Sequence, residues 1–100
     1  MMEMKFEWDA AKAESNFKAH GVSFELAETV FEDAFAIGRI DDREEYGEQR
    51  FILLGMAKGQ ILLLVAYTER GDRTRIISAR KVTKHEQQQY FKENSSTYVH

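Results

Sequence analysis

Residues 61–82 read ILLLVAYTERGDRTRIISARKV and contain two apolar runs, one on either side of Gly71 and Asp72. The first run, Ile61–Thr68, is almost continuously apolar, which favours a strand in the centre of a sheet. Glycine and aspartate favour a tight turn, and Arg73–Val82 follows as the next strand. The two segments are therefore predicted to pair as antiparallel neighbours, and this pair sets the fold.

The segments before this pair extend the sheet. Phe51–Met56 is a second apolar strand, and residues 57–60 have the length and the glycine of a hairpin turn. Ala36–Ile40 has a weaker strand pattern. The Glu-rich segment Asp41–Gln49 also contains a glycine and is predicted to be a loop.

Two helices are predicted near the N-terminus. Asp9 is a typical N-cap for a helix that ends at His20, and Gly21 occupies the left-handed position after that end. Ser23 caps the second helix. Its apolar stripe consists of Phe24, Ala27 and Phe31, with Leu26 and Val30 beside it.

The two ends of the chain complete the order of elements. Met4–Trp8 alternates between apolar and polar residues and suits a short strand, while Thr83 is a cap for a last helix, Lys84–Glu93. Segment 94–100 has no periodicity and is expected to be a flexible tail. The order is β-α-α-β-β-β-β-α, which predicts a single α+β domain over residues 1–100. Its small, mostly antiparallel sheet should be covered by helices on one face.

Composition excludes several classes of site. The chain has no cysteine, and its three histidines, His20, His85 and His100, are far apart in sequence, so no metal centre is expected. No glycine-rich phosphate loop is present, and no cofactor is expected. Met1–Trp8 lacks a basic segment followed by an apolar run, and Ile61–Tyr67 is too short to cross a bilayer. We therefore expect a cytoplasmic protein without a membrane partner.

The charge is distributed unevenly along the chain. Residues 1–48 contain 5 Lys and Arg against 13 Asp and Glu, whereas residues 49–100 contain 9 against 4. The local charges are therefore -8 and +5, although the net charge of the chain is only -3. The stretch Arg70–Lys84 is the most basic and is a candidate binding face for an anion, with a merely solvated surface as the alternative.

Arginine is the residue type best suited to bind phosphate here, because its planar guanidinium donates two parallel hydrogen bonds and is always charged. In a regular strand Arg75 and Arg80 point to opposite faces, so only one of them can line a given cleft unless a bulge intervenes. Arg80 is favoured because it lies near the strand end. The alternative is that each arginine only forms a surface ion pair, with Glu69 or Glu86 as partners.

Two further side chains are candidates for proton transfer. His20 stands at a helix C-terminus, and imidazole exchanges protons near neutral pH, so it is a candidate acid or base. The alternative is a surface histidine that caps the last carbonyls. Tyr90 lies on the last helix beside Phe91 and is a candidate catalytic or stacking group, with a place in the core as the alternative. Trp8 is interpreted as a packing residue.

Two sets of residues, one in each half of the chain, have the spacing of a known family. The first set is Phe6-Glu7-Trp8-Asp9, Lys12, Asn16, His20-Gly21-Val22-Ser23-Phe24, Ala27 and Val30-Phe31-Glu32-Asp33. The second set is Arg43-Glu44-Glu45-Tyr46-Gly47, Arg50, Leu54-Gly55, Tyr67-Thr68-Glu69-Arg70, Arg75-Ile76-Ile77-Ser78-Ala79-Arg80-Lys81, Thr83, Glu86 and Tyr90. In these residues nearly the whole chain resembles the BrnT family of type II toxins.

The resemblance implies a fold similar to that of RelE ribonucleases and inhibition of translation through RNA cleavage. It also implies neutralisation by a BrnA antitoxin with a ribbon-helix-helix domain, so that the chain would contact DNA only through its partner. The chain departs from the family pattern at three positions: Ala19, Ala34 and Gln49 replace a lysine, a proline and a glutamate. The first departure removes a cation next to His20.

These observations predict a metal-independent endoribonuclease in which the 2′-hydroxyl of the RNA attacks the adjacent phosphate. The catalytic candidates are Arg80, Arg70, His20 and Tyr90, and the candidates for binding the RNA backbone are Arg75, Lys81, Lys84 and Lys18. The antitoxin is expected to cover the basic face, and the acidic segment Asp41–Glu48 is expected to face away from it. The alternatives are a non-catalytic co-repressor that binds the antitoxin and a domain that binds RNA without cutting it.

Overall fold

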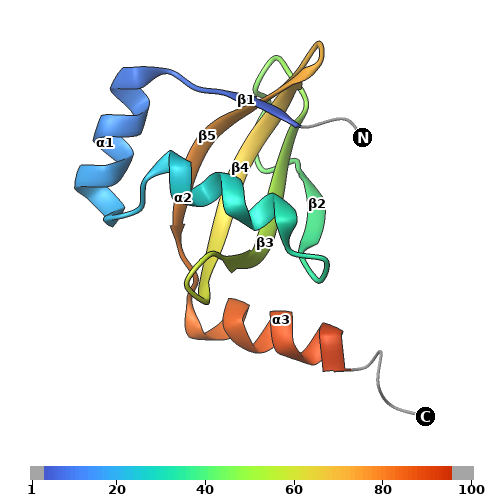
Figure 1. Ribbon diagram of the computed structural model, residues 1–100. Coiled ribbons are helices and arrows are strands. Elements are labelled where there is room, and N and C mark those ends of the chain that lie inside the picture. Colours follow the sequence, from blue (N-terminus) through green and yellow to red (C-terminus); the bar gives the residue numbers. More distant parts are fainter. Residues whose placement is uncertain (1–3, 96–100) are drawn as a thin grey trace.

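The computed structural model describes residues 4–95 as one five-stranded sheet with three α-helices, in the predicted order of elements. The strand order in the sheet is β1-β5-β4-β3-β2, and only β1 runs parallel to its neighbour (Figure 1). The strands are β1 (Lys5–Glu7), β2 (Ile37–Asp41), β3 (Arg50–Ala57), β4 (Ile61–Arg70) and β5 (Arg73–Lys81). The predicted α+β class and the central position of the apolar strand β4 are confirmed.

Both N-terminal helices begin at the predicted N-caps, and the first ends at the predicted glycine. In α1 (Ala10–His20) the Asp9 carboxylate accepts a hydrogen bond from the Lys12 backbone N–H, and Gly21 adopts a φ of 69° after the helix end. The Ser23 hydroxyl accepts from the Leu26 N–H at the start of α2 (Phe24–Glu28). Both caps satisfy backbone groups that a helix end leaves without partners.

The predicted second helix is shorter than its apolar stripe suggested. After Glu28 the chain tightens into a 3-10 turn, η1 (Thr29–Glu32). Thr29 explains this change, because its hydroxyl donates to the Leu26 carbonyl at 2.7 Å and accepts from the Lys58 N–H at 2.8 Å. A side chain that bonds to its own preceding turn and to the β3–β4 hairpin favours a local departure from α-helical geometry.

The core lies between one face of the sheet and the helices α1 and α2. We call this the covered face; its apolar residues Leu63, Val65, Ile76 and Ala79 pack against Val22, Phe24, Ala27 and Val30. The opposite side, which we call the open face, carries Ile52, Leu64, Ala66, Ser78 and Arg80. Figure 1 shows α2 across one face of the sheet, α1 beside the sheet next to β5, and α3 (Lys84–Ser95) at one end of the strands.

A bulge in β5 changes which residues share the open face. Ser78 pairs with Ala66 but Ile76 pairs with Tyr67, so Ile77 is an extra residue between two regular stretches. The extra residue reverses the alternation of side chains. Arg75 and Arg80 therefore point to the same face, whereas a regular strand would have placed them on opposite faces.

The last helix is longer than predicted. It begins at Lys84 after the predicted Thr83 cap, but it continues through Asn94 to Ser95. The Asn94 amide donates to the carbonyls of Phe35 and Tyr90, and these bonds fasten the last turn. The expected tail at 94–100 is therefore corrected for its first two residues, and residues 96–100 lie outside the described part of the chain. Within residues 4–95 none of the helices has the length and apolar character needed to cross a membrane.

Candidate functional site

The open face of the sheet contains a hollow of about 280 Å³ next to the end of α1. It is lined by His20, Arg43, Ile52, Leu64, Ala66, Ser78, Ala79 and Arg80. A second hollow of about 360 Å³ shares Arg43, Ile52, Leu64 and Arg80 with the first and extends toward β2. The floor of both hollows is the apolar sheet surface around Ile52 and Leu64. Basic groups stand at the rim of the first hollow, whereas the rim of the second has three arginines and three carboxylates, those of Asp41, Asp42 and Glu86. This combination suits a ligand that has anionic and flat apolar parts.

Arg80 is fixed by the start of α3. Its two terminal nitrogens each donate to one carboxylate oxygen of Glu86 at 2.9 Å, and Nη1 also donates to the Lys81 carbonyl. Glu86 in turn forms a capping box with Thr83, since each accepts from the backbone N–H of the other. The Arg80 side chain and these N–H groups hold the pKa of Glu86 at about 2, so this carboxylate is ionised at neutral pH. The same capping box that begins α3 therefore holds Arg80 over the hollow.

His20 reaches the hollow because Asn16 anchors α1 to the outer edge of β5. The buried Asn16 amide donates to the Ala79 carbonyl at 2.7 Å and accepts from the Ala79 N–H at 3.1 Å. Residues four apart lie on one side of a helix, so the same helix side that carries Asn16 carries His20. Because Arg80 follows Ala79 in the chain, this anchor places His20 near Arg80.

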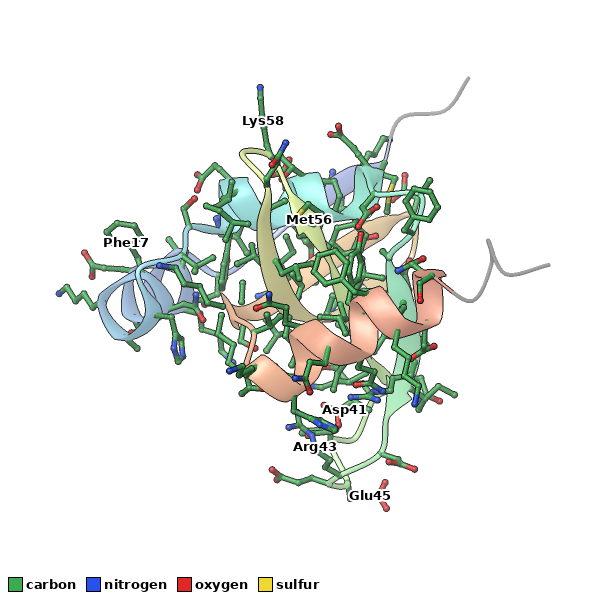
Figure 2. All side chains as sticks on the ribbon, turned by 90° about the horizontal axis from the view of Figure 1, so that it is seen from below. Phe17, Asp41, Arg43, Glu45, Met56 and Lys58 are labelled. Carbon is green, nitrogen blue, oxygen red and sulfur yellow. The ribbon has the colours of Figure 1, made fainter. Side chains whose placement is uncertain are left out.

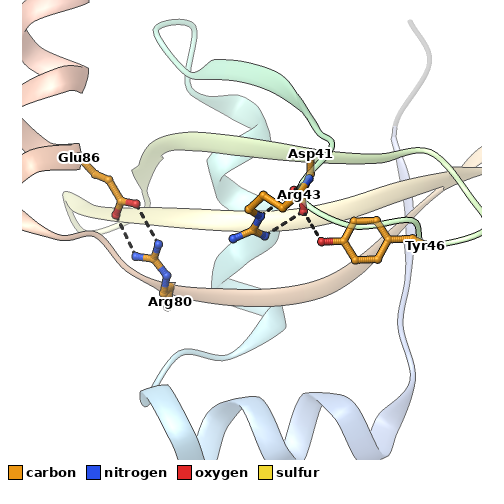
Figure 3. A network of polar contacts seen from close by, with 5 residues as sticks. All are labelled: Asp41, Arg43, Tyr46, Arg80 and Glu86. Carbon is orange, nitrogen blue, oxygen red and sulfur yellow. Dashed lines mark hydrogen bonds and ion pairs between the residues drawn. The ribbon is translucent and has the colours of Figure 1, made fainter.

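Arg43 is the basic residue at the rim that sequence reasoning missed. It follows β2, and its guanidinium donates from Nε and Nη2 to the Asp41 carboxylate at 2.7 and 2.9 Å (Figure 3). Tyr46 donates to the same carboxylate from its hydroxyl. These bonds hold the pKa of Asp41 at about 2, with the Arg43 contact as the main cause. Asp41 is almost fully buried, whereas the Arg43 side chain is 66% exposed.

The position of Arg43 corrects the expectation for segment 41–48. Sequence reasoning placed this segment away from Arg80, but Asp41, Asp42 and Arg43 line the same hollow as Arg80. Figure 2 shows Asp41 and Arg43 side by side at the base of the loop, while Glu45 lies farther out. The expectation was based on the average charge of the loop. It therefore missed Arg43, whose side chain is oriented by the nearby Asp41 carboxylate.

A local signal for this arrangement is present in the sequence. The Arg43 backbone N–H donates to the Asp41 carboxylate two residues earlier, which is an Asx turn. An aspartate that ends a strand and is followed two residues later by arginine has the spacing for such a turn, with the arginine side chain in reach of the same carboxylate. The register that brings this turn beside Arg80 is not local.

Arg70 does not meet Arg80. Leu64 is the β4 residue that pairs with Arg80, and Arg70 lies six residues farther along β4, which is a distance of about 20 Å along a strand. Arg70 instead pairs with Glu48 at 3.3 Å. Because β5 runs back from the turn that follows Arg70, the two arginines lie at opposite ends of the hairpin and cannot contact one phosphate.

Tyr90 also lies apart from the hollow. Its side chain is 5% exposed, and its hydroxyl donates to Asp33 at 2.7 Å. Asp33 accepts at the same time from the backbone N–H groups of Met56 and Phe35. Burial is the main cause that raises the pKa of Tyr90 to about 12. The hydroxyl is therefore committed to a contact between α3 and the region before β2.

The four predicted backbone-binding residues are dispersed. Arg75 is on the open face but is paired with Glu7 at 2.9 Å. Lys81 lines a separate hollow beside Phe91, on the side of the covered face. Lys18 and Lys84 are exposed, Lys18 two residues before His20 and Lys84 at the first position of α3. Neither of these two lysines is among the residues that line the hollow.

The residues at the rim have the chemical properties needed for reaction at a phosphodiester. Arg80 and Arg43 supply fixed positive charge, and His20 supplies an imidazole that can donate or accept a proton. The apolar floor around Ile52 and Leu64 lowers the local polarity, which strengthens electrostatic interactions with a bound anion.

Comparisons with known proteins show the family of the chain and a similar fold. Residues 8–86 match the family model described as the ribonuclease toxin, BrnT, of type II toxin-antitoxin systems. The crystal structure of the Brucella abortus ribonuclease toxin BrnT is similar in fold, with a TM-score of 0.60 and 22% sequence identity. The alignment covers 82% of this chain and 100% of that one. No curated protein sequence matched the chain.

Proposed function

The chain belongs to the BrnT family of ribonuclease toxins of type II toxin-antitoxin systems, and we propose that it is a metal-independent endoribonuclease whose active site is the hollow on the open face. The observation that carries this proposal is the meeting of His20 and Arg80 at one hollow. The two residues come from distant parts of the sequence. The hydrogen bond from Asn16 to Ala79 holds the helix that carries His20, and Glu86 holds Arg80 directly.

In the proposed reaction the 2′-oxygen of a ribose forms a bond to the adjacent phosphorus, and the bond from phosphorus to the 5′-oxygen breaks. The products are a 2′,3′-cyclic phosphate and a free 5′-hydroxyl. His20 transfers one of the two protons, and water accepts or supplies the other. Such proton transfer contributes about 10²- to 10⁴-fold to the rate. Arg80 stabilises the charge that develops on the non-bridging oxygens.

We propose that RNA outside the hollow contacts Lys18 and Lys84, which are exposed in the last turn of α1 and at the first position of α3. Each phosphate contact by an exposed lysine makes the affinity more sensitive to salt. Arg75 and Lys81 contribute at longer range, because Arg75 is paired with Glu7 and Lys81 lies toward the covered face. Arg70 and Tyr90 have no direct role in this proposal.

The family implies an antitoxin partner. We propose that this partner is a BrnA-like protein with a ribbon-helix-helix domain, and that it covers the hollow with acidic and apolar side chains. The complex would then contact DNA only through the antitoxin. Cleavage of RNA by the free toxin in the cytoplasm would inhibit translation.

A second candidate function is a non-catalytic co-repressor that only binds the antitoxin. The observation that favours it is Ala19, which replaces a lysine of the family pattern next to His20 and is exposed. This candidate keeps the antitoxin contact and predicts that the chain alone neither cuts RNA nor arrests growth.

The test uses the purified toxin, free of antitoxin, and single-stranded RNA in EDTA. We expect cleavage with 2′,3′-cyclic phosphate ends and a loss of about 10²- to 10³-fold in Arg80→Ala. Arg80→Lys should lose less, because lysine keeps the charge but not the planar fork. Arg73→Ala, which removes an exposed arginine at the other end of β5, is the matched control and should cleave normally.

Two outcomes contradict the proposal. Cleavage that stops in EDTA and returns with a divalent cation would exclude the metal-independent reaction. Absence of both cleavage and growth arrest, with antitoxin binding intact, would support the co-repressor instead.

A further inference from the structure

The buried Asp41 carboxylate holds the exposed Arg43 side chain at the hollow, and the proposed reaction assigns no role to this pair. Asp41 accepts four hydrogen bonds: three from Arg43, through its backbone N–H, Nε and Nη2, and one from Tyr46. Burying a charge costs free energy that an exposed partner offsets poorly. The Asp41–Arg43 contact is therefore expected to add little to stability. Its main effect is to fix the direction of the Arg43 guanidinium.

The edges of the two guanidiniums that remain available are complementary. Arg43 uses its side edge, Nε and Nη2, for Asp41, so Nη1 and the outer hydrogen of Nη2 remain. Arg80 uses its end edge, Nη1 and Nη2, for Glu86, so Nε and the inner hydrogen of Nη2 remain. Each arginine thus retains one edge with two parallel donors, and each edge matches two oxygens of a phosphate.

The two guanidiniums are also close enough to affect each other. The positive charge of Arg43 lowers the pKa of Arg80, although the Glu86 contact raises it by more. Two like charges at one apolar hollow repel each other unless an anion lies between them. Figure 3 shows both side chains above the same strands, with their carboxylate partners on the outer sides.

We propose that Arg43 and Arg80 form a two-arginine clamp for one phosphate of the RNA, and that Asp41 and Glu86 are its positioning residues. This inference rests on the proposed function, because it assigns the ligand of the same hollow. The clamp binds a phosphodiester through one edge of each guanidinium. His20 lies at the same hollow as the clamp, in position for proton transfer at the phosphate that is held there.

The first test measures cleavage by Arg43→Ala. We expect kcat/KM to fall about 10²-fold, since a fixed donor at a developing charge is lost. Arg73→Ala is the matched control, because Arg73 is exposed, carries the same charge and lies at the other end of β5. We expect the control variant to lose less than about threefold in kcat/KM. Equal losses in the two variants would indicate a general effect of positive charge and overturn the clamp.

The second test separates positioning from folding. In Asp41→Asn the amide oxygen still accepts one hydrogen bond, but the ionic contact that directs Arg43 is lost. We expect kcat to fall about tenfold while thermal unfolding and antitoxin binding change little. Asp41→Glu should recover part of the activity. An Asp41→Asn variant that keeps the parent kcat, with its fold intact, would show that the carboxylate does not position Arg43 for the reaction.

The third test asks whether the two arginines share one phosphate. The probe is a fluorescent DNA oligonucleotide, which has the phosphates but lacks the 2′-hydroxyl. If the arginines share one phosphate, the slope of log affinity against log salt should fall by about 0.7, the value for one phosphate contact on a single strand, in the double variant Arg43→Ala/Arg80→Ala, and by less than this in Arg43→Ala alone. In cleavage, the double variant Arg43→Ala/Arg80→Ala should fall by less than the product of the single losses.

The outcomes distinguish this inference from the proposed function. If the parent cuts RNA and Arg80→Ala does not, but Arg43→Ala cuts within threefold of the parent, only the clamp is wrong. A double variant whose loss equals the product of the single losses would mean that the arginines act on separate phosphates, which also overturns the clamp. If the parent itself does not cut RNA, the proposed function fails first.

Discussion

On β4, Leu63 and Val65 are fully buried against the helices, while Leu64 and Ala66 between and beside them line the hollow on the other face. Successive residues of the same strand therefore belong to two different environments. The covered face is closed by apolar contacts to Phe24 and Val30, and the open face is ringed by arginines held by carboxylates. Stability is concentrated on the first face, which leaves the second free to carry charged groups that bind a ligand.

If the faces have these separate tasks, Phe24→Ala on the covered face should have the largest effect on stability. Phe24 has no exposed surface, and its ring meets Trp8 edge to face at 5.8 Å between centroids. We expect a loss of about 3–5 kcal/mol in the free energy of unfolding, measured with urea. Such a loss is a large share of the stability of a small domain. Stability within 1 kcal/mol of the parent would mean that the core lies elsewhere.

Asn16→Ala tests the polar contact that joins α1 to β5. It removes the partners of the Ala79 N–H and carbonyl, so we expect a loss of about 2–3 kcal/mol in unfolding free energy. Cleavage should also fall, because His20 is no longer held beside Arg80. Asn16→Asp is the matched variant. It still accepts from the Ala79 N–H but cannot donate to the carbonyl, so it should not restore either property.

Tyr90→Phe removes the hydroxyl bound to Asp33 and leaves the ring in place. Hydrogen bonds to charged groups contribute about 1.5–3 kcal/mol, and we expect a loss near the lower end because Asp33 keeps two backbone donors. The rate of RNA cleavage per folded molecule should not change. A large drop in that rate, measured under conditions where the variant is fully folded, would return Tyr90 to the active site.

Acid should weaken the open face before the covered face. The pKa values of Asp41 and Glu86 are about 2, below their ordinary values of 3.8 and 4.5. Their contribution to stability is therefore present above about pH 4.5 and is lost as the pH falls toward 2. We expect a contribution on the order of 1 kcal/mol in total, because both arginine partners are partly exposed. The stability difference between the parent and Asp41→Asn/Glu86→Gln, followed by urea unfolding, should narrow over this range.

Arg70→Ala should have the smallest effect. Arg70 is half-exposed, is paired with Glu48, and lies far from the hollow along β4. We expect a change within about 0.5 kcal/mol in unfolding free energy and less than a twofold change in cleavage. A loss comparable to that of Arg80→Ala would place the site at the other end of the hairpin.

The features that the sequence predicted well depend on contacts within a few residues. The Asp9 and Ser23 caps, the Gly21 turn and the cap at Thr83 each involve hydrogen bonds that span three or four residues. Short-range bonds leave a signal in the local order of residue types. The pairing of β3, β4 and β5 followed from the same local signals, because these runs are separated by recognisable turns. The parallel pairing of β1 with β5 joins distant residues and was not predicted.

The site could be predicted only in part, because it depends on pairing between distant strands. Arg80 and His20 were identified as candidates from their residue types and positions near element ends. The extra residue at Ile77 reverses the side-chain alternation in β5, and its position is set by the register with β4. The approach of Arg43 to Arg80 likewise requires the register of β2, β3, β4 and β5 together. A charge average over residues 41–48 contains none of this information.

The Asn16 amide also determines how this sheet can be extended by another chain. β1 covers only residues 73–75 of β5, which leaves the outer edge of Ala79 without a strand partner. Asn16 occupies that edge with one donor and one acceptor, as a strand would. An incoming strand would have to displace the amide before it could pair there. At the opposite end of the sheet, no strand among residues 4–95 pairs with the outer side of β2. Edge-to-edge association is thereby directed to β2, on the side of the molecule where Arg39 and Ile40 border the second hollow.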